Sequence, residues 1–206
     1  METFIQIIEF LGTFAAAISG VRLAAAKEFD WFGGYVVGLA TAIGGGTLRD
    51  VMIDATPFWM TKSIYIICTG IALVVVLIFK KYLVRLNNTW FIFDTLGLAF
   101  FTVAGIQKSM MFGFPFWVSI TMGCITGAAG GVVRDVLINE VPLIFRKEIY
   151  ALASIVGGVL FYLLLMAGVG DAICAIICFV SVVLVRVLAV KYHISLPHLK
   201  AEDLER

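Results

Sequence analysis

The amino-acid sequence predicts an all-α integral membrane protein with seven transmembrane helices. Of its 206 residues, 62% are hydrophobic and only 14% are charged. A soluble domain of this length has too high a surface-to-volume ratio to bury that much apolar surface. Apolar runs long enough to cross a hydrocarbon core of ~30 Å recur along the whole chain. These runs are continuous, whereas strands of a transmembrane β-barrel would be short and alternating in hydrophobicity.

Hydropathy predicts where the seven spans lie. The first begins at METFIQIIEFLGTFAAA, which carries Glu2 where a signal peptide would be basic, so we expect it to be retained as a span. The polar residues 191–206 predict a short cytoplasmic tail. The predicted spans are residues 3–26, 32–54, 63–80, 89–107, 115–139, 149–168 and 170–190.

A segment of 28 residues occurs twice in the chain, 85 positions apart. Gly38–Tyr65 aligns with Gly123–Tyr150, and 12 of the 28 aligned positions are identical. Chance would give roughly two or three identities in so apolar a chain, which indicates a true internal repeat. The predicted organisation is a first three-helix repeat, a second three-helix repeat and a seventh helix. Their boundaries are 1–87, 88–169 and 170–190, followed by the tail 191–206.

Lysine and arginine residues predict the orientation of the chain. With the N-terminus outside, the inner segments contain eleven of them and the outer segments two, Lys62 and Lys108. The positive-inside rule therefore places the N-terminus outside and the C-terminus in the cytoplasm. Because each repeat holds an odd number of spans, the two copies are inverted relative to each other. Inverted repeats of this kind place their functional site near the membrane midplane.

Glycines cluster near the middle of the second and fifth spans. Each costs roughly 1 kcal/mol of helix stability relative to alanine. Such a cluster either breaks and kinks its helix or allows another helix to pack very closely, and the sequence leaves both interpretations open. The clustered residues are Gly44, Gly45 and Gly46 in the second span, and Gly127, Gly130 and Gly131 in the fifth.

Two threonines, Thr41 and Thr126, occupy equivalent repeat positions one turn before the glycines. Together with carbonyls exposed by a broken helix, their hydroxyls would replace part of an ion's hydration shell. The alternative is that each hydroxyl bonds its own helix, as isolated threonines in membrane spans commonly do.

An Arg-Asp pair follows each glycine cluster by one turn, as Arg49–Asp50 and Arg134–Asp135. Charged groups within a span are costly and usually face a polar cavity or a partner. The alternative is that these helix ends reach the lipid headgroups, with the arginines snorkelling. Because the pairs are equivalent in the repeat and both follow glycines, we favour a shared polar site.

Acidic residues within the spans, Glu9 and Asp94 included, outnumber the deeper arginines, which favours cation passage. Neighbouring residues on a helix do not face each other, so we expect ion pairs to cross the pseudo-two-fold axis. The expected pairs are Arg49 with Asp135 or Asp94, and Arg134 with Asp50 or Glu9.

Several classes of function are disfavoured by the sequence. The net charge of +1 gives no electrostatic footprint for nucleic acid. Four cysteines lie within apolar spans without zinc-type spacing, so we expect neither a metal site nor a cofactor. No P-loop, nucleophile elbow or H-E-x-x-H spacing is present, so we expect no enzymatic activity.

The motifs GGGTLRD (Gly44–Asp50) and AGGVVRD (Ala129–Asp135), 85 residues apart, resemble prokaryotic members of the trimeric intracellular cation (TRIC) channel family. Bacterial members of this family also carry the label of a glycine-transporter domain. The resemblance covers residues 5–190. It implies a homotrimer in a prokaryotic inner membrane, with one water-filled pathway per subunit lined by kinked second and fifth helices. Ala129 replaces the first glycine of the motif, so a milder break is expected in the fifth span.

The resemblance also implies that K⁺ is the main permeant ion and that Na⁺ passes. It places Arg49, Asp50, Arg134 and Asp135 around the pathway. We therefore expect a potassium-permeable monovalent cation channel whose partners are its own copies, membrane lipids and monovalent cations. The alternative is a secondary transporter of a small solute such as an amino acid, because half-helix N-termini in inverted repeats can face a carboxylate.

Overall fold

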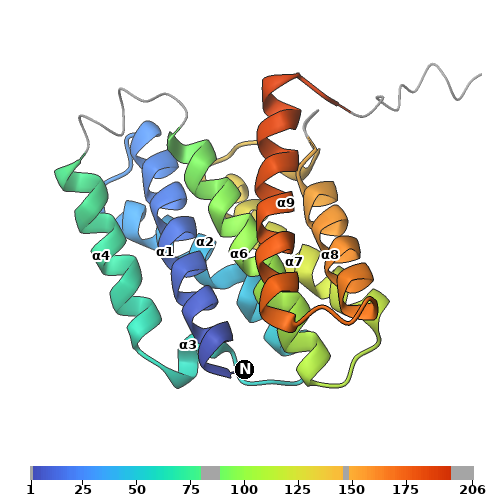
Figure 1. Ribbon diagram of the computed structural model, residues 1–206. Coiled ribbons are helices and arrows are strands. Elements are labelled where there is room, and N and C mark those ends of the chain that lie inside the picture. The colour runs from blue at the N-terminus through green and yellow to red at the C-terminus, as the bar shows by residue number, and fades with distance from the viewer. Residues whose placement is uncertain (1, 80–88, 146–148, 196–206) are drawn as a thin grey trace, which may run out of the picture.

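The computed structural model describes residues 2–79, 89–145 and 149–195, and its long elements are helices (Figure 1). Two short helical turns, α3 (Phe58–Thr61) and the 3-10 helix η1 (Leu143–Phe145), follow equivalent helices of the two repeats. The long helices are α1 (Glu2–Ala26), α2 (Trp31–Met52), α4 (Ile64–Ile78), α6 (Thr89–Met111), α7 (Phe116–Leu137), α8 (Ala151–Met166) and α9 (Asp171–Lys191).

The composition of these helices is that of a membrane protein. α1, α6, α7 and α9 are long and apolar enough to cross a membrane, with mean hydropathies from 1.5 to 2.9. α4 and α8 are apolar but shorter, with 15 and 16 residues. Large apolar side chains stay exposed on the outer helices, among them Ile67, Leu163 and Leu184 at 58%, 56% and 54%. A surface of this kind requires lipid or another subunit to cover it.

The internal repeat is visible in the backbone. α2 and α7 begin and end at positions 85 residues apart. Each is followed by a residue in the left-handed region, Asp54 and Asn139, both with φ of 56°. In both cases the next amide donates a hydrogen bond of 2.8 Å to the carbonyl of the aspartate five residues earlier. This is a Schellman motif, and short polar residues such as Asp and Asn can occupy its left-handed position.

α2 and α7 cross each other at their glycines. A Cβ atom added at Gly45 would come within 3.0 Å of the Thr126 carbonyl oxygen, and one added at Gly130 would crowd the Thr41 carbonyl oxygen in the same way. Both helices run unbroken through the clusters, so the predicted interruption of the helix is wrong. Gly45 and Gly130 serve close backbone-to-backbone packing, the other interpretation that the sequence left open.

The seventh long helix, α9, breaks the symmetry of the two repeats. α4 packs directly on α1, whereas α9 packs on both α6 and α8. Figure 1 shows α9 passing in front of α6, with α8 beside it. At the α8–α9 contact Gly157 leaves room for Val182 and for the Cys178 carbonyl. The chain begins at one end of the bundle and α9 ends at the opposite end (Figure 1).

Candidate functional site

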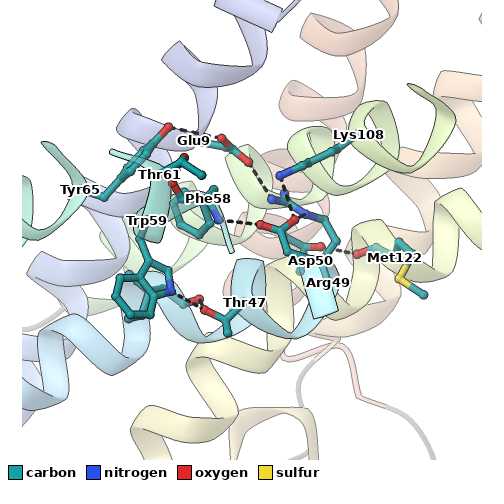
Figure 2. Close-up of polar contacts among 12 residues, drawn as sticks. Glu9, Thr47, Arg49, Asp50, Phe58, Trp59, Thr61, Tyr65, Lys108 and Met122 are labelled. Carbon is teal, nitrogen blue, oxygen red and sulfur yellow. Dashed lines mark hydrogen bonds and ion pairs between the residues drawn. The ribbon is translucent and has the colours of Figure 1, made fainter. Parts of the chain in front are cut away.

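Arg49 lies at the centre of a buried group of polar side chains at the end of α2 (Figure 2). Its Nη2 donates to Glu9 Oε1 at 2.7 Å and its Nε donates to Asp50 Oδ1 at 2.8 Å. The amide of Phe58, at the start of α3, donates to Asp50 Oδ2 at 2.8 Å. The Tyr65 hydroxyl lies 3.4 Å from Glu9 Oε2. The first charge cluster comprises Glu9, Arg49, Asp50, Tyr65 and Lys108.

The second repeat builds the same arrangement at the end of α7. Arg134 donates to Asp94, and its Nε donates to Asp135 Oδ1 at 2.9 Å. The amide of Leu143 donates to Asp135 Oδ2 at 3.0 Å, and the Tyr150 hydroxyl lies 3.4 Å from Asp94 Oδ1. Each bond joins residues 85 positions after those of the first repeat. The second charge cluster comprises Asp94, Arg134, Asp135, Tyr150 and Arg186.

The predicted ion pairs across the pseudo-two-fold axis are wrong. Arg49 pairs with Glu9 and Asp50, and Arg134 pairs with Asp94 and Asp135, so each arginine binds acids of its own repeat. Adjacent residues were not expected to pair, but each arginine does pair with the aspartate that follows it. The arginine side chain is long enough to fold around the end of its own helix. The amide of the following short helix then holds the second oxygen of the aspartate.

One side chain in each cluster does reach across the repeats. Lys108 of α6 places Nζ 2.9 Å from Asp50 Oδ1. Arg134 Nη1 donates to Ser19 Oγ of α1 at 2.8 Å. These two contacts differ in charge, so the pseudo-symmetry of the site is incomplete.

Lys108 and Arg186 are members of the site that sequence reasoning missed. Arg186 on α9 is fully buried, with its guanidinium carbon 4.7 Å from the Tyr150 ring centre and 5.1 Å from that of Phe91. Its Nη2 lies 3.9 Å from Asp94 Oδ2. From the sequence, Arg186 was counted with the inner charges and Lys108 with the outer charges. Leaving them out gives ten inner against one outer, so the predicted orientation is unchanged.

With these two cations, each cluster is formally neutral. Two carboxylates face Arg49 and Lys108 in the first cluster, and two face Arg134 and Arg186 in the second. The excess of acids that favoured cation passage in the sequence is therefore absent from the folded site. Desolvated charges of this kind are tolerated in an apolar interior only when they are paired in this way.

Tyr65 and Tyr150 are also part of the site and were not singled out in the sequence. Both tyrosines are buried. Tyr65 lies against Glu9 of α1, and Tyr150 lies against Asp94 of α6. The repeat alignment contained the signal, because these two tyrosines are identical at the 85-residue offset.

The two threonines bond their own helices. Thr41 Oγ1 donates to the Val37 carbonyl at 2.6 Å, and Thr126 Oγ1 donates to the Met122 carbonyl at 2.5 Å. Both line a small cavity at the glycine crossing, with a volume of about 10 Å³. This volume is at the lower limit for one water molecule.

A larger cavity, the first vestibule, reaches the first charge cluster from the end of the bundle where α1 begins. Its volume is about 340 Å³, and Glu9, Tyr65 and Lys108 lie in its wall. The cavity at this end of the bundle is thus wide, whereas the cavity at the glycine crossing is narrow. Among the residues that the structure describes, no group of three or more His, Cys, Asp or Glu side chains could hold a metal ion.

Comparisons with known proteins agree with this geometry. A family model described as "Glycine transporter" matches the chain twice, over residues 6–81 and 91–166. A UPF0126 membrane protein of Vibrio cholerae is 36% identical over 95% of this chain and 82% of its own length. The UPF0126 inner membrane protein YadS of Escherichia coli is 35% identical over 92% of this chain and 93% of its own.

Solved structures show the same fold. The TRIC trimeric intracellular cation channel orthologue from Rhodobacter sphaeroides superposes with a TM-score of 0.88 and 28% identity, over 93% of this chain and all of that one. A prokaryotic TRIC channel determined in 0.5 M KCl superposes with a TM-score of 0.86 and 28% sequence identity, over 95% of this chain and all of that one. The sequence resemblance, the repeat and the fold agree, and the chain belongs to the prokaryotic TRIC channel family.

Proposed function

We propose that this protein is a potassium-permeable monovalent cation channel that works as a homotrimer with one pathway in each subunit. The family is one of membrane channels rather than enzymes, and the similar solved structures are described as cation channels. The observation that carries the proposal is the order of polar features along one route. The first charge cluster lies in the wall of the first vestibule, and the cavity at the glycine crossing is lined by residues of the second charge cluster, Asp94 and Tyr150. This order supports a route that would run from the first vestibule past the first cluster and the glycines to the second cluster.

The structure corresponds to a closed pathway under this proposal. The cavity of about 10 Å³ at the glycine crossing is too small for a hydrated K⁺ ion. Conduction therefore requires α2 and α7 to separate or to bend at their glycines, which would expose the carbonyls of Thr41 and Thr126 to the ion. The kinks expected at Gly44–Gly46 and at Gly130–Gly131 stay a prediction.

Lys108 supports a role for the first cluster in admitting cations. Its ammonium lies 2.9 Å from Asp50 Oδ1, the place that a permeant cation would take. The lysine side chain is 19% exposed, so it borders the first vestibule and can withdraw into it. An incoming K⁺ ion would compete with this tethered cation for the same carboxylate.

The proposed orientation keeps the N-terminus outside and the C-terminus in the cytoplasm. Exposed aromatic residues support opposite directions for the two repeats. Trp31 and Phe32 begin α2, and Trp117 begins α7, with exposures of 73%, 74% and 72%. Tryptophan favours the headgroup region, so inverted repeats would place Trp31 and Trp117 at the two opposite membrane surfaces.

Recording from purified protein in planar bilayers tests the proposal. We expect discrete openings, a reversal potential that follows the K⁺ gradient, and a current that keeps rising with ion concentration. The second candidate, transport of a small solute such as glycine, is favoured by the family description and by a vestibule of about 340 Å³. Saturable uptake of labelled glycine into proteoliposomes without such openings would favour the transporter and contradict the channel.

A further inference from the structure

The two ends of the polar route differ although the repeats that build them are equivalent. Three residues in the wall of the first vestibule are Ala55, Lys108 and Phe112. Their equivalents at the 85-residue offset are Glu140, Leu23 and Lys27. These three residues belong to the opposite end of the bundle, which we call the second mouth.

An ion pair joins the two repeats at the second mouth. Lys27 Nζ lies 2.6 Å from Glu140 Oε1. Lys27 follows α1 and Glu140 follows α7, so the pair ties the connection after the first helix to the connection after the fifth span. Glu28, next to Lys27, has a φ of 60°, and Asn139, next to Glu140, has a φ of 56°. Each of the two paired side chains is therefore carried by a tight turn. At the first vestibule the equivalent residues, Phe112 and Ala55, carry no charge.

An apolar contact lies beneath this ion pair. Ile138 is buried against Ala24 and Val37, and Leu23 packs on the same group. Leu23 occupies in the first repeat the position that Lys108 holds in the second, so an apolar side chain stands where the equivalent position carries a charge. Leu23 lies in the last turn of α1 and Lys27 follows the helix directly, so both belong to the same end of the bundle. The second mouth thus has an apolar plug with an ion pair above it.

We propose that Lys27 and Glu140 form a latch that holds the second mouth closed over the plug of Leu23 and Ile138. This inference rests on the proposed function only in treating the second mouth as one end of an ion pathway. Both side chains are partly exposed, at 41% and 38%, so solvent and salt reach the pair. An exposed ion pair stabilises one of two states weakly, and its loss shifts their ratio by about two- to fivefold. The latch therefore biases the mouth toward closure and lets it open reversibly.

The test measures how accessible the plug is, using the full-length protein in proteoliposomes. Leu23→Cys serves as a reporter, and its rate of modification by a charged, membrane-impermeant thiosulfonate is followed from the side of the second mouth. Lys27→Gln or Glu140→Gln should each raise this rate about two- to fivefold. The exchange of both charges, Lys27→Glu with Glu140→Lys, should restore the slow rate. Lys191→Gln, which neutralises an exposed lysine at the end of α9, is the matched control.

Salt gives a second readout that does not depend on a substitution in the latch. Raising the ionic strength to about 1 M screens an exposed pair and should speed modification of the reporter, but should not do so once Lys27→Gln is present. The protein without Leu23→Cys gives the background from its own cysteines, three of which are buried.

The outcomes separate the latch from the channel. Unchanged rates in both single variants would overturn the latch, and so would failure of the charge exchange to restore the slow rate. Faster modification in the single variants without any K⁺ current in planar bilayers would keep the latch and contradict the channel. Current without any effect on the modification rate would keep the channel and remove the latch.

Discussion

Individual charged residues decide the stability of this protein because they are paired away from solvent. Arg49 and Arg134 are fully buried, and their partners Glu9 and Asp94 are at most 5% exposed. Removing one member of such a pair leaves a buried charge uncompensated, which costs far more than the intact pair contributes. The clusters therefore act as all-or-none units in which each carboxylate is required by its arginine.

Replacing Glu9 with leucine should lower the free energy of unfolding by about 3–5 kcal/mol, because Arg49 then lacks its α1 carboxylate. Gln6→Leu, three residues earlier on α1 and half-buried, is the matched control and should change stability much less. Thermal unfolding in detergent, followed by circular dichroism, measures both. Equal unfolding temperatures for the two variants would contradict the paired-charge interpretation.

Removing the charge of Lys108 should raise K⁺ conductance, because Asp50 loses the tethered cation that competes with permeant ions. Lys108→Gln keeps a polar side chain of similar length while leaving the first charge cluster with one net negative charge. Lys62→Gln alters another lysine of the first vestibule and controls for a general change in surface charge. Single-channel current at low KCl concentration is the measurement, and a lower or unchanged current in Lys108→Gln would count against the competition.

The sequence predicted which residues belong to the site better than it predicted which of them form ion pairs with each other. The repeat offset identified Glu9, Asp50, Asp94 and Asp135 as equivalent polar positions, and all four lie in the clusters. An offset states which residues are equivalent but not how far apart they lie, so it could not show that each arginine stays within its own repeat. Arg186 was missed because it lies outside the repeat and because its burial depends on how α9 packs.

At the scale of elements, the crossing of α2 and α7 depends more on Gly45 than on the adjacent Gly44. A Cβ atom at Gly45 would collide with the backbone carbonyl of Thr126, which cannot move aside. A Cβ atom at Gly44 would lie 3.6 Å from the Gly130 Cα, its nearest neighbour, which is ordinary van der Waals contact. Composition alone cannot separate these adjacent glycines, since only the direction of the crossing helix distinguishes them.

Gly45→Ala should therefore destabilise the fold by about 1–3 kcal/mol or more through overpacking. Gly44→Ala should be neutral, or stabilising by up to about 1 kcal/mol because alanine is the better helix former. Unfolding midpoints of the two variants, measured side by side, give the comparison. A larger loss for Gly44→Ala than for Gly45→Ala would show that the helices do not cross as described.

Among the described residues, two equivalent sets of helices are followed by α9, which has no equivalent in either set. The long helices follow the predicted order, and the number of them that cross the membrane stays a prediction. What the sequence could not provide is the way in which α9 packs on α6 and α8 while α4 packs directly on α1. Periodicity predicts that a helix exists, whereas its neighbours depend on side-chain shape at contacts such as Gly157 with Val182.

Inverted repeats require residues 27 and 62 to lie on opposite sides of the membrane. Single-cysteine variants Lys27→Cys and Lys62→Cys should react with an impermeant thiol reagent from opposite sides of oriented vesicles, with Lys62→Cys reacting from outside. Both positions are exposed in the structure, so labelling does not depend on channel opening. Labelling of both from one side would exclude the inverted arrangement.

The contact between α2 and α7 also says something about how such a protein could arise. Gly45 faces Thr126 while Gly130 faces Thr41, and these are the same two positions exchanged between the repeats. This reciprocity is the hallmark of a two-fold symmetric dimer interface. Two copies of a half-length ancestor, inserted in opposite directions, would have formed the same contact between separate chains. Fusion of the duplicated gene would then have made a pre-existing antiparallel dimer permanent and freed each half to diverge, as Lys108 and Leu23 have done.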